Sequence, residues 1–235
     1  MEGKKMAIIT PGPTVAAVSG SIGGTVYSHN RGGAYIRNRS IPVTSVTTPA
    51  LNAKQRLATA SAAWQLLTDL QRTAWGSWAL QNPVINALGF ARHLTGHQAY
   101  VGINARRASA GDVALSVPPI VPAPDGLLTL VQDGDIGAGD TDCTFTATPL
   151  GATEELYIEA AVTNSPGINN VNNLLKLVGF SAAAQASPFD NQALIEARLG
   201  TLVVGQKLFV RISVYDNATG LLSLPLVDDV IITTT

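Results

Sequence analysis

The sequence predicts an α+β protein with three parts: an N-terminal extended arm and β-hairpin, a small helical unit, and a C-terminal antiparallel β-sandwich. Three observations lead to this prediction. Side chains alternate with a period of two near the N-terminus, apolar residues recur at helical spacing after Pro49, and short β-rich runs fill the second half. We expect the arm and hairpin over residues 1–48, the helices over 49–115, a Pro-rich linker over 116–124 and the sandwich over 125–235.

The hairpin is predicted by residues 20–39, which read GSIGGTVYSHNRGGAYIRNR. Side chains alternate between two faces over 26–29 and again over 34–37, and Asn-Arg-Gly-Gly at 30–33 supplies the turn. A two-stranded hairpin is barely stable alone in water, so it has to pack on something else. We expect a neighbouring subunit; packing on the chain's own helices is the alternative. The residues expected to make this docking contact are Tyr27, Arg31, Tyr35, Ile36, Arg37 and Arg39.

The edges of this hairpin are expected to offer unpaired amides and carbonyls to another sheet. Five nearby glycines would let a neighbouring backbone approach closely. Residues 1–19, with Pro11 and Pro13, are predicted to be an extended arm. The chain is also expected to stay extended from the hairpin to Pro49, because proline lacks the amide that a helix or a central strand would use.

Three helices are predicted between Thr48 and Gly111. The first starts with Thr48 as a cap and Pro49 at the first helical position, and runs for about 15 residues. The second and third each begin with the Thr-x-x-Gln spacing of a capping box, at Thr68 to Gln71 and at Thr95 to Gln98. The glycine at 111 is expected to end the third helix.

Beyond the four prolines of SVPPIVPAP, seven alternating or β-branched runs are separated by turn residues. This pattern is typical of a sandwich of the immunoglobulin or fibronectin-III type. A turn over 217–220 is predicted to lead into the last strand. The runs are GLLTLVQD, DCTFTATP, ELYIEAAV, LLKLVGF, ALIEARLG, KLFVRISVYD and LVDDVIITT.

The composition indicates a protein whose surface is partly covered by other molecules. Hydrophobic residues make up 46% of the 235 residues and charged residues only 13%. Eleven basic and two acidic residues lie in the first 110 positions, whereas four basic and fourteen acidic residues follow. This asymmetry fits either a basic face for nucleic acid or attraction between oppositely charged parts of neighbouring copies. We expect no membrane span, because no apolar run approaches the roughly 18 residues that one needs, and no cleaved signal peptide.

The histidines, the cysteine and the acidic residues do not form a catalytic or cofactor-binding site. His93 and His97 are four residues apart, but Gly96 and a predicted helix cap fall between them, and no carboxylate completes a metal site. The acidic loop 133–142 has oxygen ligands suited to calcium yet lacks the EF-hand spacing, so a hairpin loop is the simpler interpretation and calcium stays open. Cys143 is expected to be a small buried side chain. We therefore expect no enzyme activity, no cofactor and no metal.

A family resemblance is carried by residues 18–110. This region contains, in order, SGSIGGTVYSHNRGGAYIRNRSIPV, a helix that starts with proline, AWQLLTDLQRTAWGSWA and TGHQAYVGINARR. In this order of segments it resembles small uncharacterised proteins encoded in structural gene clusters of tailed phages and prophages. The resemblance implies a virion structural component, capsid-decorating or tail-associated, that is made in the host cytoplasm and carried in the virion. It brings no catalytic residues.

These observations together predict a non-enzymatic assembly subunit. We expect it to dock on copies of itself and on other virion structural proteins through its N-terminal arm and hairpin, and to form homo-oligomers. Non-specific contact with packaged DNA is a second expectation, because arginines interleaved with tyrosines on a β-ribbon suit phosphates and bases.

The alternative is a surface adhesion or carbohydrate-binding β-sandwich module. Such a module would need an exposed aromatic platform on the sandwich. The only tyrosines there, Tyr157 and Tyr215, alternate with their neighbours as core residues do. This pattern favours the assembly interpretation.

Overall fold

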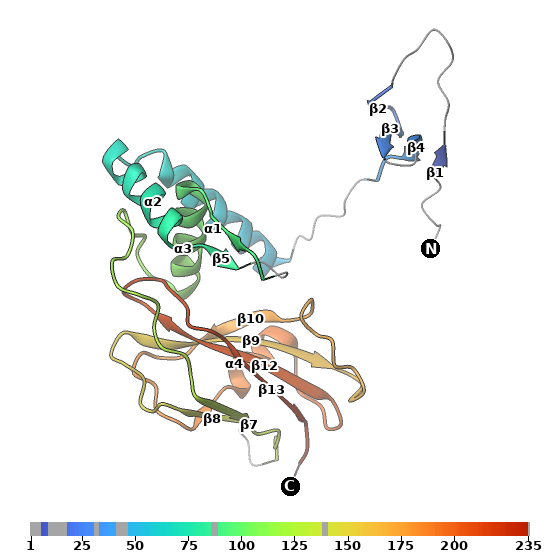
Figure 1. Ribbon diagram of the computed structural model, residues 1–235. Coiled ribbons are helices and arrows are strands. Elements are labelled where there is room, and N and C mark those ends of the chain that lie inside the picture. The colour runs from blue at the N-terminus through green and yellow to red at the C-terminus, as the bar shows by residue number, and fades with distance from the viewer. Residues whose placement is uncertain are drawn as a thin grey trace. The chain divides into compact units, whose positions relative to one another are not determined.

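The computed structural model describes residues 6–8, 18–30, 33–40, 47–85, 89–137 and 141–234. The chain divides into two compact units, Met1–Leu51 and Asn52–Thr235. The described residues form four α-helices and antiparallel sheets, so the protein belongs to the mixed α+β class, as predicted (Figure 1).

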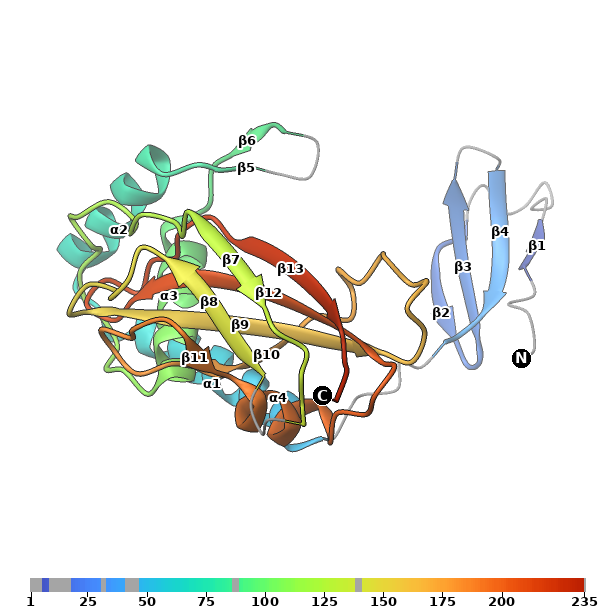
Figure 2. The same cartoon turned by 90° about the horizontal axis from the view of Figure 1, so that it is seen from below.

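The smaller unit is a single antiparallel sheet with the strand order β1-β4-β3-β2 (Figure 2). β3 (Thr25–Asn30) and β4 (Gly33–Asn38) form the predicted hairpin, in register from Thr25 opposite Asn38 to Asn30 opposite Gly33. β1 (Met6–Ile8) pairs with the outer edge of β4, and β2 (Gly20–Ile22) pairs with the outer edge of β3. The hairpin prediction is confirmed, and two further strands of the same chain flank it.

The helical part contains the three predicted helices, α1 (Thr48–Trp64), α2 (Asp69–Gln81) and α3 (Gly96–Ala110). Both predicted capping boxes are present. The Thr68 hydroxyl accepts from the Gln71 amide at 3.3 Å, and the Gln71 side chain accepts from the Thr68 amide at 2.9 Å. Thr95 and Gln98 repeat this exchange at the start of α3. As predicted, α3 ends at a glycine, Gly111, in the left-handed conformation.

A small aromatic core holds α2 against α3. Trp75 is fully buried, and its ring meets that of Tyr100 edge-on at a centroid distance of 5.4 Å. The Trp75 indole N–H donates to the Ser116 carbonyl at 3.0 Å, so its one polar group has a partner. A two-stranded ribbon of β5 (Val84–Ile85) and β6 (Ala91–Arg92) lies between α2 and α3 in the chain.

The C-terminal part consists of two antiparallel sheets. One has the order β10-β9-β12-β13 and the other the order β11-β8-β7. The longest pairing joins β9 and β12 over ten residues each. The strand bounds are β7 (Thr129–Gln132), β8 (Asp142–Thr146), β9 (Glu154–Thr163), β10 (Lys176–Phe180), β11 (Phe189–Asp190), β12 (Lys207–Asp216) and β13 (Leu226–Ile231).

One hydrophobic core joins these two sheets. Side chains of β8 from one sheet and of β9 and β12 from the other belong to the same buried cluster, which makes the arrangement two layers deep. On β9 and β12 the members of this cluster stand at every second position, so they share the face that meets the other sheet. The fully buried members of the cluster are Cys143, Phe145, Leu156, Ile158, Ala160, Ile195, Leu208, Val210, Ile212, Val214 and Ile232.

One predicted strand is wrong: the run ALIEARLG is helix α4 (Gln192–Leu199). Alanine, leucine, glutamate and arginine all favour helix, and Ile195 and Leu199 stand four residues apart, so both pack on the core from one side of the helix. Gly200 ends the helix with a φ of 97°. The strand beside β8 on the side away from β7 is instead the two-residue β11, which was not predicted.

The predicted linker, residues 116–124, contains neither helix nor strand. The helices that precede it and the sheets that follow it belong to the same compact unit. The helices and the sheets contact each other directly, at the end of α3 and at the turn between β12 and β13.

Candidate functional site

The N-terminal sheet has no core of its own. Among residues 18–29 and 33–40, every side chain is exposed or half-exposed and none is buried. A sheet normally buries one face against another layer, and in this unit the described residues provide no second layer. The hairpin that the sequence marks as a docking element is therefore part of a one-layer sheet whose faces are open.

The register of the hairpin sorts the predicted docking residues onto two faces. Tyr27 and Ile36 stand directly opposite each other, so they share one face. Ile22 of β2 pairs with Thr25, which places it on that same face, and Ile22 is 73% exposed. This apolar face, defined by Ile22, Tyr27 and Ile36, crosses three strands.

Tyr35 and Arg37 lie on the opposite face, because they pair with Ser28 and Val26. The Nε atom of Arg37 is covered by neighbouring atoms, yet the described residues give it no hydrogen-bond acceptor. A covered donor without an acceptor costs free energy. Arg39 follows β4 and is exposed, and its amide donates to the Gly24 carbonyl at 2.7 Å. Arg31 lies outside the described residues.

The expectation that both hairpin edges are open is wrong for half of each strand. β1 covers the edge of β4 from Tyr35 to Arg37, and β2 covers the edge of β3 from Thr25 to Tyr27. The chain itself satisfies these backbone groups because Met6–Ile8 and Gly20–Ile22 are themselves strands. The edges of the sheet are therefore β1 and β2 rather than the hairpin strands, and its two faces are the larger surfaces that it offers.

The larger unit is held together where α3 meets the β12–β13 turn. Arg107, which is 6% exposed, donates from Nε to the Val113 carbonyl at 2.7 Å and from Nη1 to the Asn217 carbonyl at 2.5 Å. The hydroxyl of Tyr215, a fully buried side chain of β12, donates to the carboxylate of Asp112. Burial raises the pKa of Tyr215, and its hydrogen bond to Asp112 adds to that rise, so the hydroxyl stays protonated.

Sequence reasoning did not find this junction. The signal available was the pair Arg106 and Arg107 at the end of a helix whose other side is apolar, since an arginine in such a place needs acceptors for its planar donors. What the local sequence does not contain is the identity of those acceptors, which are backbone carbonyls more than a hundred residues away.

The other residues singled out from sequence have structural partners. His97 of α3 is within 3.3 Å of the Ser61 hydroxyl and meets the Trp64 ring edge-on. Asp133 accepts from the amides of Gly134 and Asp135, which is the geometry of a tight turn. Asp140 of the acidic loop lies outside the described residues.

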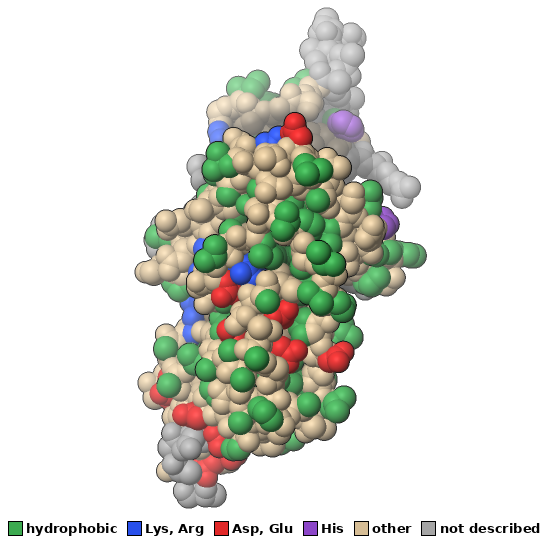
Figure 3. Space-filling view, turned by 90° about the vertical axis from the view of Figure 1, so that its left-hand side faces the viewer, with side chains coloured by type: hydrophobic (Ala, Val, Ile, Leu, Met, Phe, Trp, Pro, Cys, Tyr) green, Lys and Arg blue, Asp and Glu red, His purple; other side chains and the backbone are tan. Residues whose placement is uncertain are grey.

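Cys143 is fully buried, as expected, and burial raises the pKa of its thiol to about 12. Tyr215 is fully buried and Tyr157 is half-buried, so neither of the two sandwich tyrosines forms an exposed aromatic platform. On the face shown in Figure 3, most acidic side chains gather over the antiparallel sheets, as the distribution of charge along the chain predicts.

The chain was compared with protein-family models, curated proteins and solved structures. None of them matches it. Within the residues that the structure describes, no helix is both long and apolar enough to span a membrane. The surfaces above therefore have to be interpreted from their own geometry and chemistry.

Proposed function

We propose that the protein is a non-enzymatic assembly subunit that docks on a neighbouring copy through the apolar face of its N-terminal sheet. The observation that carries this proposal is the open one-layer sheet, in which Ile22, Tyr27 and Ile36 share a face and no described side chain is buried. Burial of such a face against a second protein would supply the missing layer.

Two further features support the same docking role. Arg37 has a covered donor without an acceptor among the described residues, and a docked neighbour would provide one. The positive first part of the chain and the acidic remainder would attract each other between copies, which orients association and raises its rate. A head-to-tail contact of this kind closes into a ring or continues as a lattice.

The setting that we propose for this subunit is a virion, as a capsid-decorating or tail-associated component. This part of the proposal rests on the motif order over residues 18–110, which resembles structural proteins of tailed phages. Its partners would be copies of itself and other virion structural proteins, and its hairpin arginines would make any contact with packaged DNA electrostatic and independent of sequence.

We also propose that the C-terminal sheets are a sandwich of the immunoglobulin or fibronectin-III type. The strands can be lettered in chain order as A (β7), B (β8), C (β9), C′ (β10), E (β11), F (β12) and G (β13). One sheet then contains A, B and E, and the other contains C′, C, F and G. The parallel bridge between Asp135 and Thr233 adds a link from the end of A to the end of G. Helix α4, between E and F, is an addition to that pattern.

Deletion of residues 1–46 tests the docking role. Thr47 is retained because its carbonyl accepts from the Leu51 amide at 3.0 Å at the start of α1. The remaining chain keeps the three buried hydrophobic clusters of the larger unit, so we expect it to unfold cooperatively and to sediment as a monomer, whereas the full chain forms oligomers. A truncated chain that assembles like the full chain, or a full chain that is monomeric at every concentration, would contradict the proposal.

A further inference from the structure

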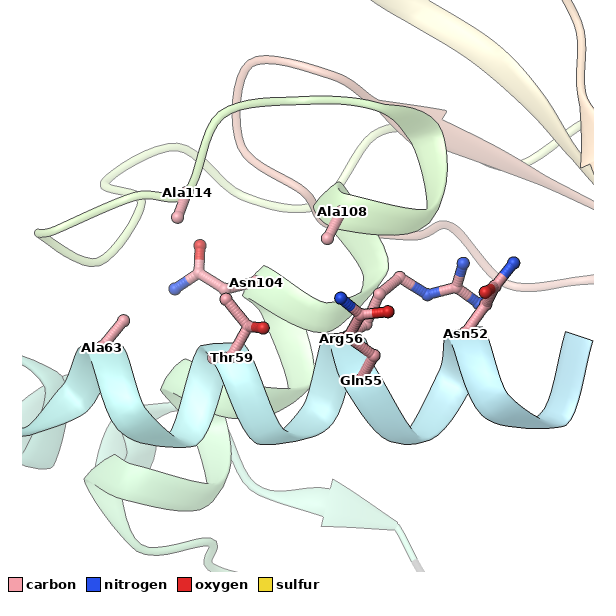
Figure 4. A pocket seen from close by; sticks show the side chains of 9 residues that line it. Asn52, Gln55, Arg56, Thr59, Ala63, Asn104, Ala108 and Ala114 are labelled. Atoms are coloured by element: carbon pink, nitrogen blue, oxygen red, sulfur yellow. The ribbon is translucent and has the colours of Figure 1, made fainter. Parts of the chain in front are cut away.

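Two arginines from different helices line one hollow beside the sandwich. Arg56 of α1 and Arg106 of α3 border a space of about 200 Å³ together with Tyr157 of β9 and Ser109. Arg56 also borders a second hollow of about 320 Å³ between α1 and α3, where it lies near Asn52 (Figure 4). Its side chain thus lies where the two hollows meet.

Neither arginine has an acidic partner among the described residues. The described residues form ion pairs at Arg72, Lys207 and Arg211, and no carboxylate lies within ion-pair distance of Arg56 or Arg106. Arg106 is half-buried, and the one hydrogen bond that the structure gives it joins Nη1 to the Gly220 carbonyl at 2.7 Å. A guanidinium has five donors, so most of those on Arg106 have no protein acceptor.

The electrostatics of the hollow favour an anion. Burial lowers the pKa of Arg106, and the groups that oppose this are the tyrosines at 157 and 215 rather than carboxylates. A half-buried cation that no carboxylate compensates is costly, and an anion drawn from solution would relieve that cost.

The charges around Tyr157 are consistent with this interpretation. Burial raises the pKa of Tyr157, the Glu159 carboxylate adds to the rise, and Arg106, Arg211 and Arg56 oppose it. Because Arg211 pairs with Glu159 at 2.6 Å, the one nearby carboxylate is already neutralised. The net charge facing the hollow is positive.

We propose that this hollow binds a phosphate group. Two guanidinium groups from two helices, with the Tyr157 hydroxyl as a third polar group, suit an anion that presents three or four oxygens better than a carboxylate, which presents two. The Tyr157 hydroxyl has no hydrogen-bond partner within the described part of the chain, so it is free to donate. This site is independent of the proposed docking role.

Titration of the full chain with inorganic phosphate, with chloride matched for ionic strength, tests the site. We expect saturable binding at about millimolar concentration or tighter, because few atoms of such a small ligand make contacts. Arg56→Gln should weaken binding about tenfold or more, and Arg106→Lys should also weaken it although it keeps the charge, since lysine lacks the planar fork. The control, Lys176→Gln, removes one exposed cation from β10 and should leave binding unchanged.

A second arm identifies the source of the phosphate. If a twelve-residue oligothymidylate competes with inorganic phosphate and its binding requires Arg56, the site takes phosphates of a nucleic-acid backbone; if only inorganic phosphate binds, the site takes the free ion. Either result supports the proposal. Binding that does not exceed the chloride control, or that Lys176→Gln weakens as much as Arg56→Gln does, would overturn it.

Discussion

The hydroxyl of Tyr215 on β12 donates a hydrogen bond to the carboxylate of Asp112, which follows α3 and is 103 residues earlier in the chain. The same contact region contains two arginine–carbonyl bonds, from Arg106 to Gly220 and from Arg107 to Asn217. These bonds are partly buried, where hydrogen bonds that involve charged groups are strong. The helical pair and the sandwich are therefore joined by specific polar contacts as well as by apolar packing.

We predict that Tyr215→Phe lowers the free energy of unfolding by about 1.5–3 kcal/mol, because it removes a hydrogen bond to a charged group and leaves Asp112 without this donor. Urea denaturation of the full chain measures the change. Tyr157→Phe is the matched control, since its hydroxyl donates to no described residue, and it should change stability by less than about 0.5 kcal/mol. Equal losses in the two variants would show that the Asp112 contact contributes nothing.

Gly220 is predicted to be essential for the close fit of α3 on the turn. Its φ is 73°, and a Cβ atom there would lie 2.8 Å from Cγ of Arg107 and 2.9 Å from Cγ2 of Ile103. We expect Gly220→Ala to lower the free energy of unfolding by about 2–4 kcal/mol, because it adds both backbone strain and overpacking. Gly205 has a similar φ of 87°, but a Cβ added there would meet open space. Gly205→Ala should therefore lower the free energy of unfolding through strain alone, by about 1–2 kcal/mol. Denaturant unfolding of both variants should therefore separate the two effects, and indistinguishable costs would argue against the contact.

Cys143 gives a prediction about alkaline pH. Its pKa is about 12 in the folded protein against 9.0 for an ordinary thiol, so the unfolded chain loses this proton first. The stability that the thiol contributes is complete below pH 9 and decreases as the pH rises from about 9 toward 12. Cys143→Ala should flatten this part of the stability curve, measured by urea denaturation between pH 8 and pH 11. An unchanged slope would contradict the prediction.

A reagent that modifies thiolates tests the burial of the same side chain directly. At neutral pH the thiol should react only after unfolding, because Cys143 is fully buried in the core between the sheets. Rapid modification of the folded protein would contradict the structure at this position.

Ile36→Asp should weaken or abolish oligomers, because it places a charge in the middle of the apolar face that we propose to be buried in the assembly. Sedimentation velocity measures the change. Leu224→Asp is the control, since Leu224 is 85% exposed in the larger unit and the substitution adds the same charge. If Leu224→Asp disrupts assembly and Ile36→Asp does not, the docking surface lies on the larger unit instead.

Local signals in the sequence identified most elements and some of their boundaries. The Thr-x-x-Gln boxes at 68–71 and 95–98 placed two helix starts correctly, because a capping box depends only on residues within one turn. The runs that form β9 and β12 were correctly predicted as strands, but the core between the sheets contains Leu156 and Ile158 rather than Tyr157, whose alternation resembled that of a core residue. Helix α4 was missed because its eight residues alternate well enough to resemble a strand, and only its helix-forming composition indicated otherwise.

Pairings between distant residues could not be predicted in the same way. The arm was expected to be extended, and extended backbone does not reveal that Met6–Ile8 pairs with β4. The contact between Arg107 and Asn217 depends on how α3 meets a turn 110 residues later. For the candidate docking site, alternation separated Ile36 from Tyr35 and Arg37, but only the register shows that Tyr27 shares the face of Ile36.

The hydrogen bonds between the end of α3 and the β12–β13 region determine what happens if the chain is cut. Residues 116–124 contain neither helix nor strand, and a protease that cleaved there would sever the covalent link between the helical pair and the sheets. The two fragments would nevertheless remain together through Arg106, Arg107 and Tyr215 until a denaturant separated them. A nicked molecule would thus migrate as one species in native gels and as two under denaturing conditions.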